Sequence, residues 1–546
     1  MSSVDAATAW LAQDPDPVTR AELQALIDAG DAAALDDRFG ARLAFGTAGL
    51  RGALGAGPNR MNRVLVAQAA AGLAAYVHEQ GGSSIVIGYD GRRNSDVFAR
   101  DSAEIIQGAG LTALLLPRLL PTPVLAFAVR HLGADAGVMV TASHNPPNDN
   151  GYKVYLGGAD DGSQIVPPAD SEIAAHIARV ADTLTFAGLP KSDAYTVADE
   201  SVVDAYIAAT ASVAPATHAA NGMNWVYTAM HGVGWQTFSR VLEVAGYPQP
   251  QVVAEQVDPD GRFPTVAFPN PEEPGAMDLA FAKAQEVGAE FIIANDPDAD
   301  RLAVGIPTAD GWRRLTGNEI GLLLGQRAAL RQAQRPEGAS GSLACSLVSS
   351  PALGLIAAKH GLDFHTTLTG FKWISRAPGL VFGFEEALGY LVNPETVRDK
   401  DGISAAVAIL SLAADARERG TTIQGLLDEL QAEIGFVASG QVSLRVDDLS
   451  IIARLMQSLR TDAPAAFGEQ GIATAEDLLD APAGEPNGDI LRYTLEDSSR
   501  VIVRPSGTEP KLKAYLDVTG TSAADAQHRL SALEQSVHQT LTSRSS

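Results

Sequence analysis

Residues 141–153 read TASHNPPNDNGYK, a polar segment that directly follows the apolar residues 138–140. Each proline lacks a backbone N–H and biases the preceding residue toward extended geometry, so this segment cannot continue a helix. A short apolar run that ends in such a segment is typical of a buried strand. We therefore expect this serine loop to begin where a strand ends, with Ser143 exposed there.

The same pattern recurs along the chain. Apolar runs at residues 291–294, 380–383 and 501–503 also end in polar loops, and helical segments separate many of the runs. Strands that alternate with helices indicate α/β units, whose ligands bind beyond the carboxyl ends of the strands. The sequence predicts three similar α/β domains with mixed sheets and a smaller C-terminal α+β domain, around a central cleft. The expected domains are residues 1–215, 216–328, 329–436 and 437–546.

The composition fits a large globular enzyme. The chain has 546 residues, of which 46% are hydrophobic and 52 are glycine. Its sequence has no apolar run of about 18 residues, the length of a membrane helix, and its first residues lack the features of a signal peptide. We expect a cytoplasmic protein. The single cysteine, Cys345, excludes an internal disulfide, and its apolar neighbours predict a buried thiol.

The formal net charge of −25 limits the classes of partner. Nucleic acid and acidic membranes need a basic surface on the protein, so we expect neither as a partner. A small phosphate ester needs only a local cluster of Arg, Lys and backbone N–H groups, which an acidic protein can carry. Small phosphorylated molecules therefore remain compatible with the charge.

Three aspartates follow the apolar run at residues 291–294. Asp296, Asp298 and Asp300 would stand about 6.5 Å apart along a straight strand, so they must curl to share one cation. Carboxylates held together repel unless a hard cation such as Mg²⁺ neutralises them. A calcium EF-hand is excluded, because its sixth position would be Arg301 and its twelfth Pro307. A metal site and a phosphatase with a nucleophilic aspartate stay open at this point.

Ser143 next to His144 suggests a serine hydrolase only weakly. Neighbouring residues rarely face each other, and no Gly-x-Ser-x-Gly motif surrounds the serine. A phosphoryl group on Ser143, with a charge of about −2, would instead complete an oxygen-rich Mg²⁺ site with the three aspartates. Lys153 and Arg51 are candidates to neutralise the transferring oxygens, since phosphoryl transfer depends on positioning and charge stabilisation.

Two further loops offer groups that bind phosphate and sugar. Residues 504–508, RPSGT, provide a guanidinium, two hydroxyls and the backbone N–H groups of a glycine turn, which suit a phosphate dianion. Glu385 and Glu386 lie in a loop bounded by glycines, where carboxylates can accept hydrogen bonds from sugar hydroxyls. The set as a whole thus points to a phosphorylated sugar.

Together these segments resemble the α-D-phosphohexomutase superfamily, the phosphoglucomutase/phosphomannomutase enzymes. Four signatures occur in the family's order over nearly the whole chain. They are the phosphoserine loop at residues 141–146, the metal loop at 296–301, the sugar-binding loop at 383–389 and the phosphate-binding loop at 504–508. The resemblance implies an intramolecular phosphotransferase that interconverts a sugar 1-phosphate and 6-phosphate.

Longer stretches are similar to the branch that contains phosphopentomutases and glucose-1,6-bisphosphate synthases beside phosphoglucomutases. These stretches are residues 45–51 (FGTAGLR), 149–155 (DNGYKVY), 369–373 (TGFKW) and 384–387 (FEEA). Many hexomutases have a serine where this chain has Ala387, so a hydroxyl contact that helps discriminate sugars at the 3- and 4-positions is missing. We expect α-D-glucose 1-phosphate and glucose 6-phosphate as the substrate pair, with phosphomannomutase or phosphopentomutase specificity as alternatives.

The mechanism that the resemblance implies is a double transfer. Phospho-Ser143, held on Mg²⁺, would give its phosphoryl group to a sugar monophosphate, and the bisphosphate would reorient and return its other phosphate to Ser143. Mg²⁺ is thus an implied cofactor, and glucose 1,6-bisphosphate an implied activator and intermediate. The group that takes the hydroxyl proton stays open between His144, Lys153 and an oxygen bound to the metal ion.

The resemblance also implies which residues hold the substrate. Arg301 and Arg51 would support the reacting phosphate, and Glu385 with Lys372 would hold sugar hydroxyls. The implied ligands of the non-reacting phosphate are Arg504, Ser506, Gly507 and Thr508. Further implied substrate contacts are Thr47, Glu386 and Lys400, and the implied metal ligands are Ser143, Asp296, Asp298 and Asp300.

Two other classes of function stay possible. A phosphatase with Asp296 or Asp298 as nucleophile would release inorganic phosphate without forming an isomer. A catalytically silent sugar-phosphate binder would not phosphorylate Ser143. In each case we expect small-molecule sugar phosphates as ligands and a chain that is a monomer or a homodimer.

Overall fold

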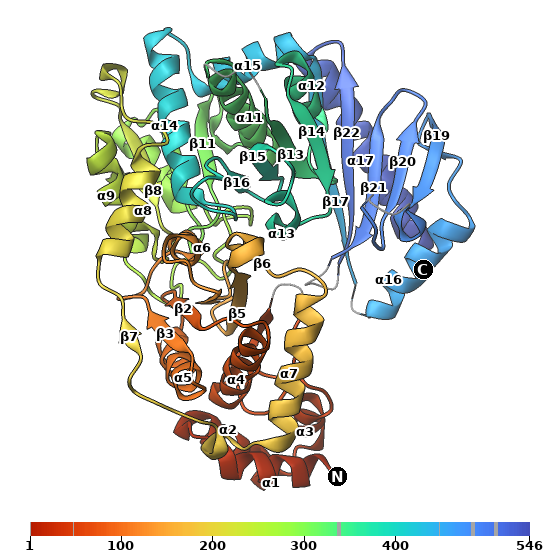
Figure 1. Cartoon of the computed structure of the whole chain (residues 1–546). Helices are drawn as coiled ribbons and strands as arrows, with labels where there is room; N and C mark the ends of the chain where they lie inside the picture. Colours follow the sequence, from red (N-terminus) through yellow and green to blue (C-terminus); the bar gives the residue numbers. More distant parts are fainter. Residues whose placement is uncertain are drawn as a thin grey trace. The chain divides into compact units, whose positions relative to one another are not determined.

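The computed structural model describes residues 2–46, 49–335, 340–446, 448–481, 486–506 and 511–545. Figure 1 shows the helices and strands of the chain, coloured along the sequence. The chain forms two compact units. The first unit consists of Met1–Leu315 and Ala387–Glu418, and the second of Thr316–Glu386 and Arg419–Ser546. The chain therefore leaves the first unit, returns to it for one segment and leaves it again.

The first unit begins with three helices and a mixed sheet. The helices that precede the sheet are α1 (Ser3–Gln13), α2 (Pro17–Ala29) and α3 (Ala32–Phe39). The strands are β1 (Leu50–Ala53), β2 (Ser84–Tyr89), β3 (Thr112–Leu115), β4 (Ala136–Val140), β5 (Asp149–Leu156), β6 (Ser163–Gln164) and β7 (Thr196–Val197), in the order β1-β5-β4-β2-β3-β7 with β6 beside β5. Strand β2 is parallel to β3 and β4, whereas β5 is antiparallel to β4 and β1.

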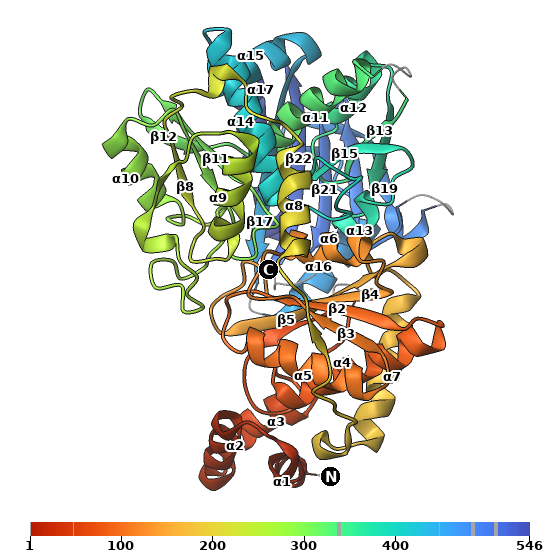
Figure 2. The same ribbon diagram turned by 60° about the vertical axis from the view of Figure 1, so that its left-hand side comes forward.

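Helices cover both faces of this sheet. They are α4 (Arg63–Glu79), α5 (Ser95–Gly108), α6 (Thr122–His131) and α7 (Ala169–Thr183). Figure 2 shows α4, α5 and α7 on one side of the sheet and α6 on the other. Every residue of β4 is buried, as expected for a central strand whose two faces are both covered. The serine loop thus leaves the sheet from its most buried strand.

The rest of the first unit contains a second mixed sheet. Its strands are β8 (Trp225–Thr228), β9 (Gln251–Val252), β10 (Phe291–Ala294), β11 (Ala303–Thr308) and β12 (Gly311–Arg314), in the order β12-β11-β10-β8-β9. The accompanying helices are α8 (Ser201–Ala211), α9 (Gly234–Ala245) and α10 (Asp278–Val287). The returning segment adds β16 (Gly389–Leu391) and α14 (Gly402–Glu418), and α14 packs against α8 and α9.

The second unit contains a parallel α/β arrangement and an antiparallel α+β arrangement. The first comprises α11 (Gly317–Ala333), β13 (Ser342–Ser346), α12 (Ala352–Lys359), β14 (Asp363–Thr367), α13 (Phe371–Ile374), β15 (Leu380–Glu385) and α15 (Ile423–Ile434), with β13 parallel to β14 and β15. The second comprises β17 (Phe436–Arg445), α16 (Leu449–Thr461), β18 (Ala466–Phe467), β19 (Gln470–Asp477), β20 (Leu491–Leu495), β21 (Arg500–Pro505), β22 (Lys511–Gly520) and α17 (Ala523–Arg544). Its strand order is β17-β22-β21-β20-β19-β18.

The predicted fold class is confirmed: α/β layers make up most of the chain, and an α+β domain follows at the C-terminal end. Helix α11 runs through the predicted boundary between residues 328 and 329. The predicted domain boundaries and the cleft stay predictions. The Cys345 thiol is buried as predicted, and burial raises its pKa to about 12. Among the described helices, none has the length and apolar character needed to cross a membrane.

Candidate active site

Ser143 lies just beyond the end of β4, as the sequence predicts, but it is buried rather than exposed. The residue is 2% exposed, because residues distant in sequence cover it. The Oγ donates a hydrogen bond of 2.9 Å to Oδ2 of Asp296 and lies 3.2 Å from Nδ1 of His144. The serine backbone is left-handed, with φ of 52°, and the adjacent imidazole does approach the hydroxyl.

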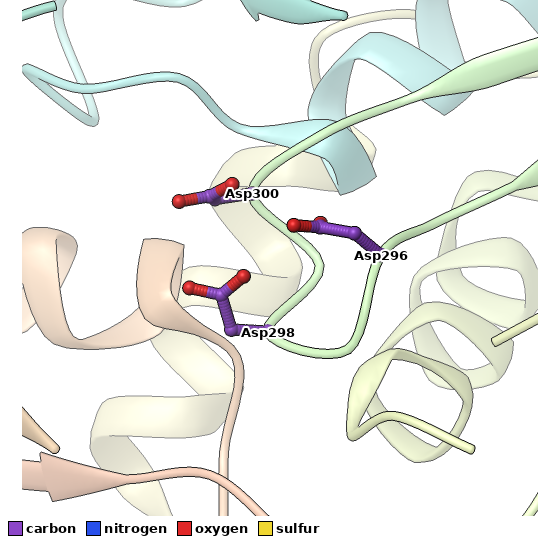
Figure 3. Close-up of side chains that lie close together, drawn as sticks. All are labelled: Asp296, Asp298 and Asp300. Carbon is purple, nitrogen blue, oxygen red and sulfur yellow. The ribbon is translucent and has the colours of Figure 1, made fainter. Parts of the chain in front are cut away.

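The three aspartates come from the loop that follows β10. This loop curls: the Ala299 N–H donates to the Asp296 carbonyl, and Ala299 has a left-handed φ of 54°. Asp296, Asp298 and Asp300 are each 0% exposed, and a carboxylate oxygen from each lies within 4.8 Å of the others. Figure 3 shows the three carboxylates projecting to one side of the loop. We call this set the aspartate cluster.

Cations of the first unit partly balance the charge of the aspartate cluster. The Lys153 Nζ lies 2.8 Å from Oδ2 of Asp298 and of Asp300, and the Lys400 Nζ lies 3.0 Å from Oδ2 of Asp300. The Arg301 Nε lies 3.9 Å from Asp300 Oδ1. A buried carboxylate needs such partners, since an unpaired charge in the interior is costly.

The protonation of the aspartate cluster follows from burial and these ion pairs. Burial and the neighbouring carboxylates hold the pKa of Asp296 well above its usual range. Burial also acts to raise the pKa of Asp298 and Asp300, but both pKa values are lowered: Lys153 outweighs burial with the Thr122 hydrogen bond at Asp298, and with Lys400 and Arg301 at Asp300. The same pairs raise the pKa of Lys153 although burial opposes this. Asp298, Asp300 and Lys153 are therefore charged at neutral pH.

The aspartate cluster fits a hard divalent cation. Oδ1 of Asp298 and Oδ1 of Asp300 are buried and have no hydrogen-bond partner among the described residues. Buried polar atoms are normally paired, so these two oxygens are available as ligands. Carboxylate oxygens are the donors that Mg²⁺ prefers. The residues present therefore match the magnesium site that the sequence predicts.

The other predicted cation of the first unit, Arg51, lies on β1. Its Nη1 donates to Asn145 Oδ1 in the serine loop at 3.2 Å, and β1 pairs with β5, which carries Lys153. Burial and the charges of Arg301 and Arg51 lower the pKa of His144 well below its usual value. The imidazole beside Ser143 is therefore neutral at pH 7.

The carboxylates of Asp399 and Asp401, on either side of Lys400 in the sequence, are both anchored by hydrogen bonds. Asp399 Oδ2 accepts hydrogen bonds from the Tyr155 hydroxyl at 2.8 Å and from Gln164 Nε2 at 2.7 Å. Asp401 accepts 3.0 Å hydrogen bonds from the Tyr206 hydroxyl. These hydrogen bonds anchor the residues on either side of Lys400, whose Nζ lies 3.0 Å from Oδ2 of Asp300.

Two residues that the sequence analysis did not identify also contribute to this site. Thr122, at the start of α6, donates from Oγ1 to Asp298 Oδ2 at 2.6 Å and from its backbone N–H to the Asp298 carbonyl at 2.9 Å. Arg92 donates four hydrogen bonds to backbone carbonyls of the serine loop. The sequence signal for Thr122 is its place between two prolines, which favours a helix start.

The second unit carries the predicted sugar and phosphate ligands. Glu386 Oε2 accepts hydrogen bonds from the hydroxyls of Ser346, at 3.1 Å, and Ser349, at 2.9 Å. Glu386 therefore holds its loop against the end of β13, while Glu385 is the last residue of β15. Glu386 is thus hydrogen-bonded within the protein, whereas the resemblance implies a contact with the substrate.

The remaining predicted ligands of the second unit lie on α13 and at the end of β21. Lys372 lies on α13, with its Nζ 5.8 Å from the ring centre of Trp373. Arg504 Nη1 donates to Thr369 Oγ1 at 2.8 Å, and the Ser506 N–H donates to the Lys511 carbonyl. Three predicted substrate residues, Thr47, Gly507 and Thr508, lie outside the described residues.

Family models of phosphoglucomutase/phosphomannomutase match four segments of the chain. Models of α/β/α domains I, II and III match residues 42–183, 204–309 and 316–434. The model of the C-terminal domain matches residues 455–532. Together these matches cover most of the chain.

Comparisons with individual proteins also find phosphosugar mutases. A Haemophilus influenzae protein named "Probable phosphomannomutase" is 56% identical over 88% of this chain and 98% of its own length. A phosphopentomutase of Mus musculus is 34% identical over 97% of this chain and 92% of its own. The crystal structure of a phosphoglucomutase/phosphomannomutase family protein from Burkholderia thailandensis, 22% identical, covers 89% of this chain and 96% of its own with a TM-score of 0.68, which supports the fold.

Proposed function

The chain belongs to the phosphoglucomutase/phosphomannomutase family, and from this premise we propose how its residues work and which sugar it prefers. It is an enzyme of the phosphosugar-mutase type, an intramolecular phosphotransferase. The observation that carries the mechanism is the 2.9 Å hydrogen bond from Ser143 Oγ to Asp296. It places the hydroxyl that would carry the phosphoryl group directly against the aspartate cluster.

Ser143 is the phosphoryl carrier. In the first half-reaction the bond between phosphorus and Ser143 Oγ breaks as a bond from phosphorus to a sugar hydroxyl forms, and the hydroxyl proton passes to a base. The resulting bisphosphate reorients, and its other phosphate moves to Ser143 Oγ by the reverse chemistry. The enzyme regains its phosphate, so the net change is the isomerisation of a sugar 1-phosphate to a 6-phosphate.

The aspartate cluster supplies the metal ligands, together with Ser143. Mg²⁺ bound there would neutralise charge on the transferring oxygens. Two carboxylate oxygens, Oδ1 of Asp298 and Oδ1 of Asp300, are available as metal ligands because they are buried without a hydrogen-bond partner in the described part of the chain. Thr122 fixes the orientation of Asp298 by binding its second oxygen.

Arg51, Arg301 and Lys153 stabilise the reacting phosphate. Arg51 donates a hydrogen bond to Asn145 in the serine loop. The Lys153 ammonium forms ion pairs with two carboxylates of the aspartate cluster. Preorganised cations stabilise the developing charge of phosphoryl transfer, which has little covalent chemistry for the protein to perform. His144 is neutral and so able to take the hydroxyl proton, whereas Lys153 is already protonated.

The resemblance supplies the proposed ligands of the sugar and of the phosphate that is not reacting. Glu385 and Lys372 hold sugar hydroxyls, and Glu386 orients the Glu385 loop through its two serine partners. Arg504 and Ser506, with Gly507 and Thr508, bind the phosphate that is not reacting. Arginine suits this role because its planar guanidinium can donate two parallel hydrogen bonds to one phosphate.

The preferred sugar is α-D-glucose 1-phosphate, with glucose 1,6-bisphosphate as activator. The stretches at residues 45–51, 149–155, 369–373 and 384–387 resemble the branch that contains phosphoglucomutases beside phosphopentomutases and glucose-1,6-bisphosphate synthases, which supports this choice. Mannose 1-phosphate is the second candidate, because the relative that is 56% identical is named a phosphomannomutase. Ala387 offers no hydroxyl to the sugar, so we expect a preference rather than strict discrimination.

One assay tests both the reaction and the sugar. Purified protein with Mg²⁺ and a trace of the matching bisphosphate is given glucose 1-, mannose 1- or ribose 1-phosphate, and both isomer and inorganic phosphate are measured. We expect isomer without net phosphate release, and the highest kcat/KM with glucose 1-phosphate. A preference of about a hundredfold for mannose or ribose would overturn the choice of sugar. Phosphate release without isomer would select the aspartate-nucleophile phosphatase instead.

A further inference from the structure

We infer that Arg92 is a positioning residue for phosphoryl transfer: it holds the serine loop in the one conformation that aims Ser143 at the aspartate cluster. This inference rests on the proposed function of Ser143. Arg92 lies beyond the end of β2 and is 4% exposed. Its Nη2 donates to the carbonyl oxygens of Ser143, at 2.7 Å, and of Asn145. Its Nη1 donates to those of Pro146, at 2.9 Å, and Asp149, at 3.1 Å.

These four hydrogen bonds explain how the serine loop keeps its shape. A serine with φ of 52° is in a region that L-residues disfavour, and such a conformation persists only where surrounding contacts over-determine it. The loop forms no helix and has two hydrogen-bonded turns, in which the Asn145 N–H donates to the Ala142 carbonyl and the Asp149 N–H to the Pro146 carbonyl. One planar guanidinium, bound to carbonyls in both turns, fixes the two turns relative to each other.

The guanidinium is itself held from the other side. Asp90 Oδ2 lies 3.6 Å from Arg92 Nε, and Asp90 Oδ1 accepts from the Arg92 N–H and from Ser95 Oγ. The ring of Phe263 covers the guanidinium, with 4.9 Å from its centre to the Arg92 Cζ. A cation between a carboxylate and an aromatic face has little freedom to turn away from the loop.

The contacts leave Arg92 no direct part in the chemistry. All four of its hydrogen bonds from Nη1 and Nη2 go to backbone carbonyls, so it acts through the position of the Ser143 Oγ. A displacement of about 1 Å in a reacting group can reduce a rate by about a hundredfold. Loss of Arg92 should therefore slow the transfer step and leave the affinity for the sugar phosphate nearly intact, because the proposed sugar ligands are elsewhere in the sequence.

The test uses Arg92→Lys and Arg92→Met in the full-length enzyme. Lysine keeps the charge but cannot bond four carbonyls in the fixed geometry of a guanidinium. The matched control is Arg100→Met: Arg100 is an exposed arginine on α5, paired with Asp96. Each protein is phosphorylated with glucose 1,6-bisphosphate, the phosphate on Ser143 is verified by intact mass, and transfer to glucose 1-phosphate is followed in a single turnover.

We expect both Arg92 variants to transfer at least about a hundredfold more slowly, with KM changed by no more than about threefold, and Arg100→Met to match the wild type. Transfer by Arg92→Lys at the wild-type rate would overturn the inference, as would a loss confined to KM. If both Arg92 variants fail to fold, Phe263→Leu tests the same point, because it removes the aromatic cover and leaves the arginine. We expect it to slow transfer about tenfold, and an unchanged rate counts against the inference.

The wild-type arm separates this inference from the proposed function. If the wild type gains no phosphate on Ser143 and forms no isomer, the proposed function is wrong and the role of Arg92 falls with it. If the wild type is phosphorylated and active while Arg92→Lys is equally fast, only the inference about Arg92 is wrong.

Discussion

At the scale of single residues, Ser143 combines an unfavourable backbone with a favourable side-chain position. Its left-handed φ of 52° costs roughly 1–2 kcal/mol for a residue with a Cβ. The same conformation brings Oγ within 2.9 Å of Asp296 and 3.2 Å of His144. Strain of this kind is typical of functional sites, where stability is sacrificed for geometry.

A comparison of Ser143→Ala with Ser143→Gly separates these two properties. Both variants lack the hydroxyl, so we expect both to lose isomerase activity and the mass increase with glucose 1,6-bisphosphate. Glycine tolerates a positive φ, so Ser143→Gly should be more stable than Ser143→Ala by about 1 kcal/mol. Thermal melting in the absence of ligand measures the difference. Equal melting temperatures would show that the strain at this position is relieved when the hydroxyl is removed.

Asp401 is a buried carboxyl group with a pH-dependent role. It accepts hydrogen bonds from Tyr206 and from the backbone N–H groups of Ile403 and Ser404, in the first turn of α14. Burial, its largest influence, raises its pKa from 3.8 to about 6. The folded protein therefore holds a proton there at pH values where the unfolded chain has lost it.

This shift predicts the pH dependence of one variant. A carboxyl group with a raised pKa contributes stability below pH 3.8, and this contribution is lost as the pH rises through about 6. Asp401→Asn keeps an acceptor for the helix N–H groups and does not titrate. The melting temperature of Asp401→Asn should therefore rise relative to that of the wild type between about pH 4 and 6.5, and melting curves across this range provide the measurement. Parallel curves would contradict the prediction.

At the scale of elements, strand ends were predictable and the contacts between loops were not. The apolar run before Ser143 and the one before Asp296 correctly placed both residues after strands. The burial of Ser143 could not be read from the sequence, because Asp296 covers it from a distant segment. Arg92 was missed for a similar reason: its partners are backbone carbonyls, which every sequence contains and no motif marks.

The packing of α11 on β15 gives a test of the fold in the second unit. A Cβ added to Gly321 on α11 would lie 2.4 Å from the Phe384 ring, and both residues are buried. Gly321→Ala should therefore destabilise the protein by about 1–3 kcal/mol, although alanine is the better helix former. Leu330→Ala on the same helix is the control, since Leu330 is exposed and its loss should change stability by less than about 1 kcal/mol. Chemical unfolding measures the free energy of unfolding of both variants. Equal values for the two variants would contradict the prediction.

At the scale of the whole molecule, an acidic chain places several basic side chains around one cluster of carboxylates. The formal net charge is −25, yet Lys153, Lys400 and Arg301 surround the aspartate cluster. The proposed reaction would bring phosphate dianions and a divalent cation to this place, where each would offset the charge of the other. The predicted monomer or homodimer stays a prediction.

Magnesium should stabilise the folded chain through the aspartate cluster. A ligand that binds only the folded state at a hundred times its Kd adds about 2.7 kcal/mol of stability. We therefore expect the melting temperature to rise when Mg²⁺ replaces EDTA, and Asp298→Asn to abolish most of the rise. Asp310→Asn, at an exposed aspartate, is the control and should respond like the wild type. A shift of equal size in Asp298→Asn would place the ion elsewhere.

The return of residues Ala387–Glu418 to the first unit sets the order in which that unit can be completed during synthesis. A ribosome has made residues 1–315 long before it reaches Lys400, Asp399 and Asp401. Until those residues leave the exit tunnel, Tyr155 and Tyr206 lack their carboxylate partners, and Asp300 lacks the ammonium of Lys400. The first unit therefore cannot be completed until residues 316–386 of the second unit have been translated. Until then, the charge of its aspartate cluster is incompletely neutralised.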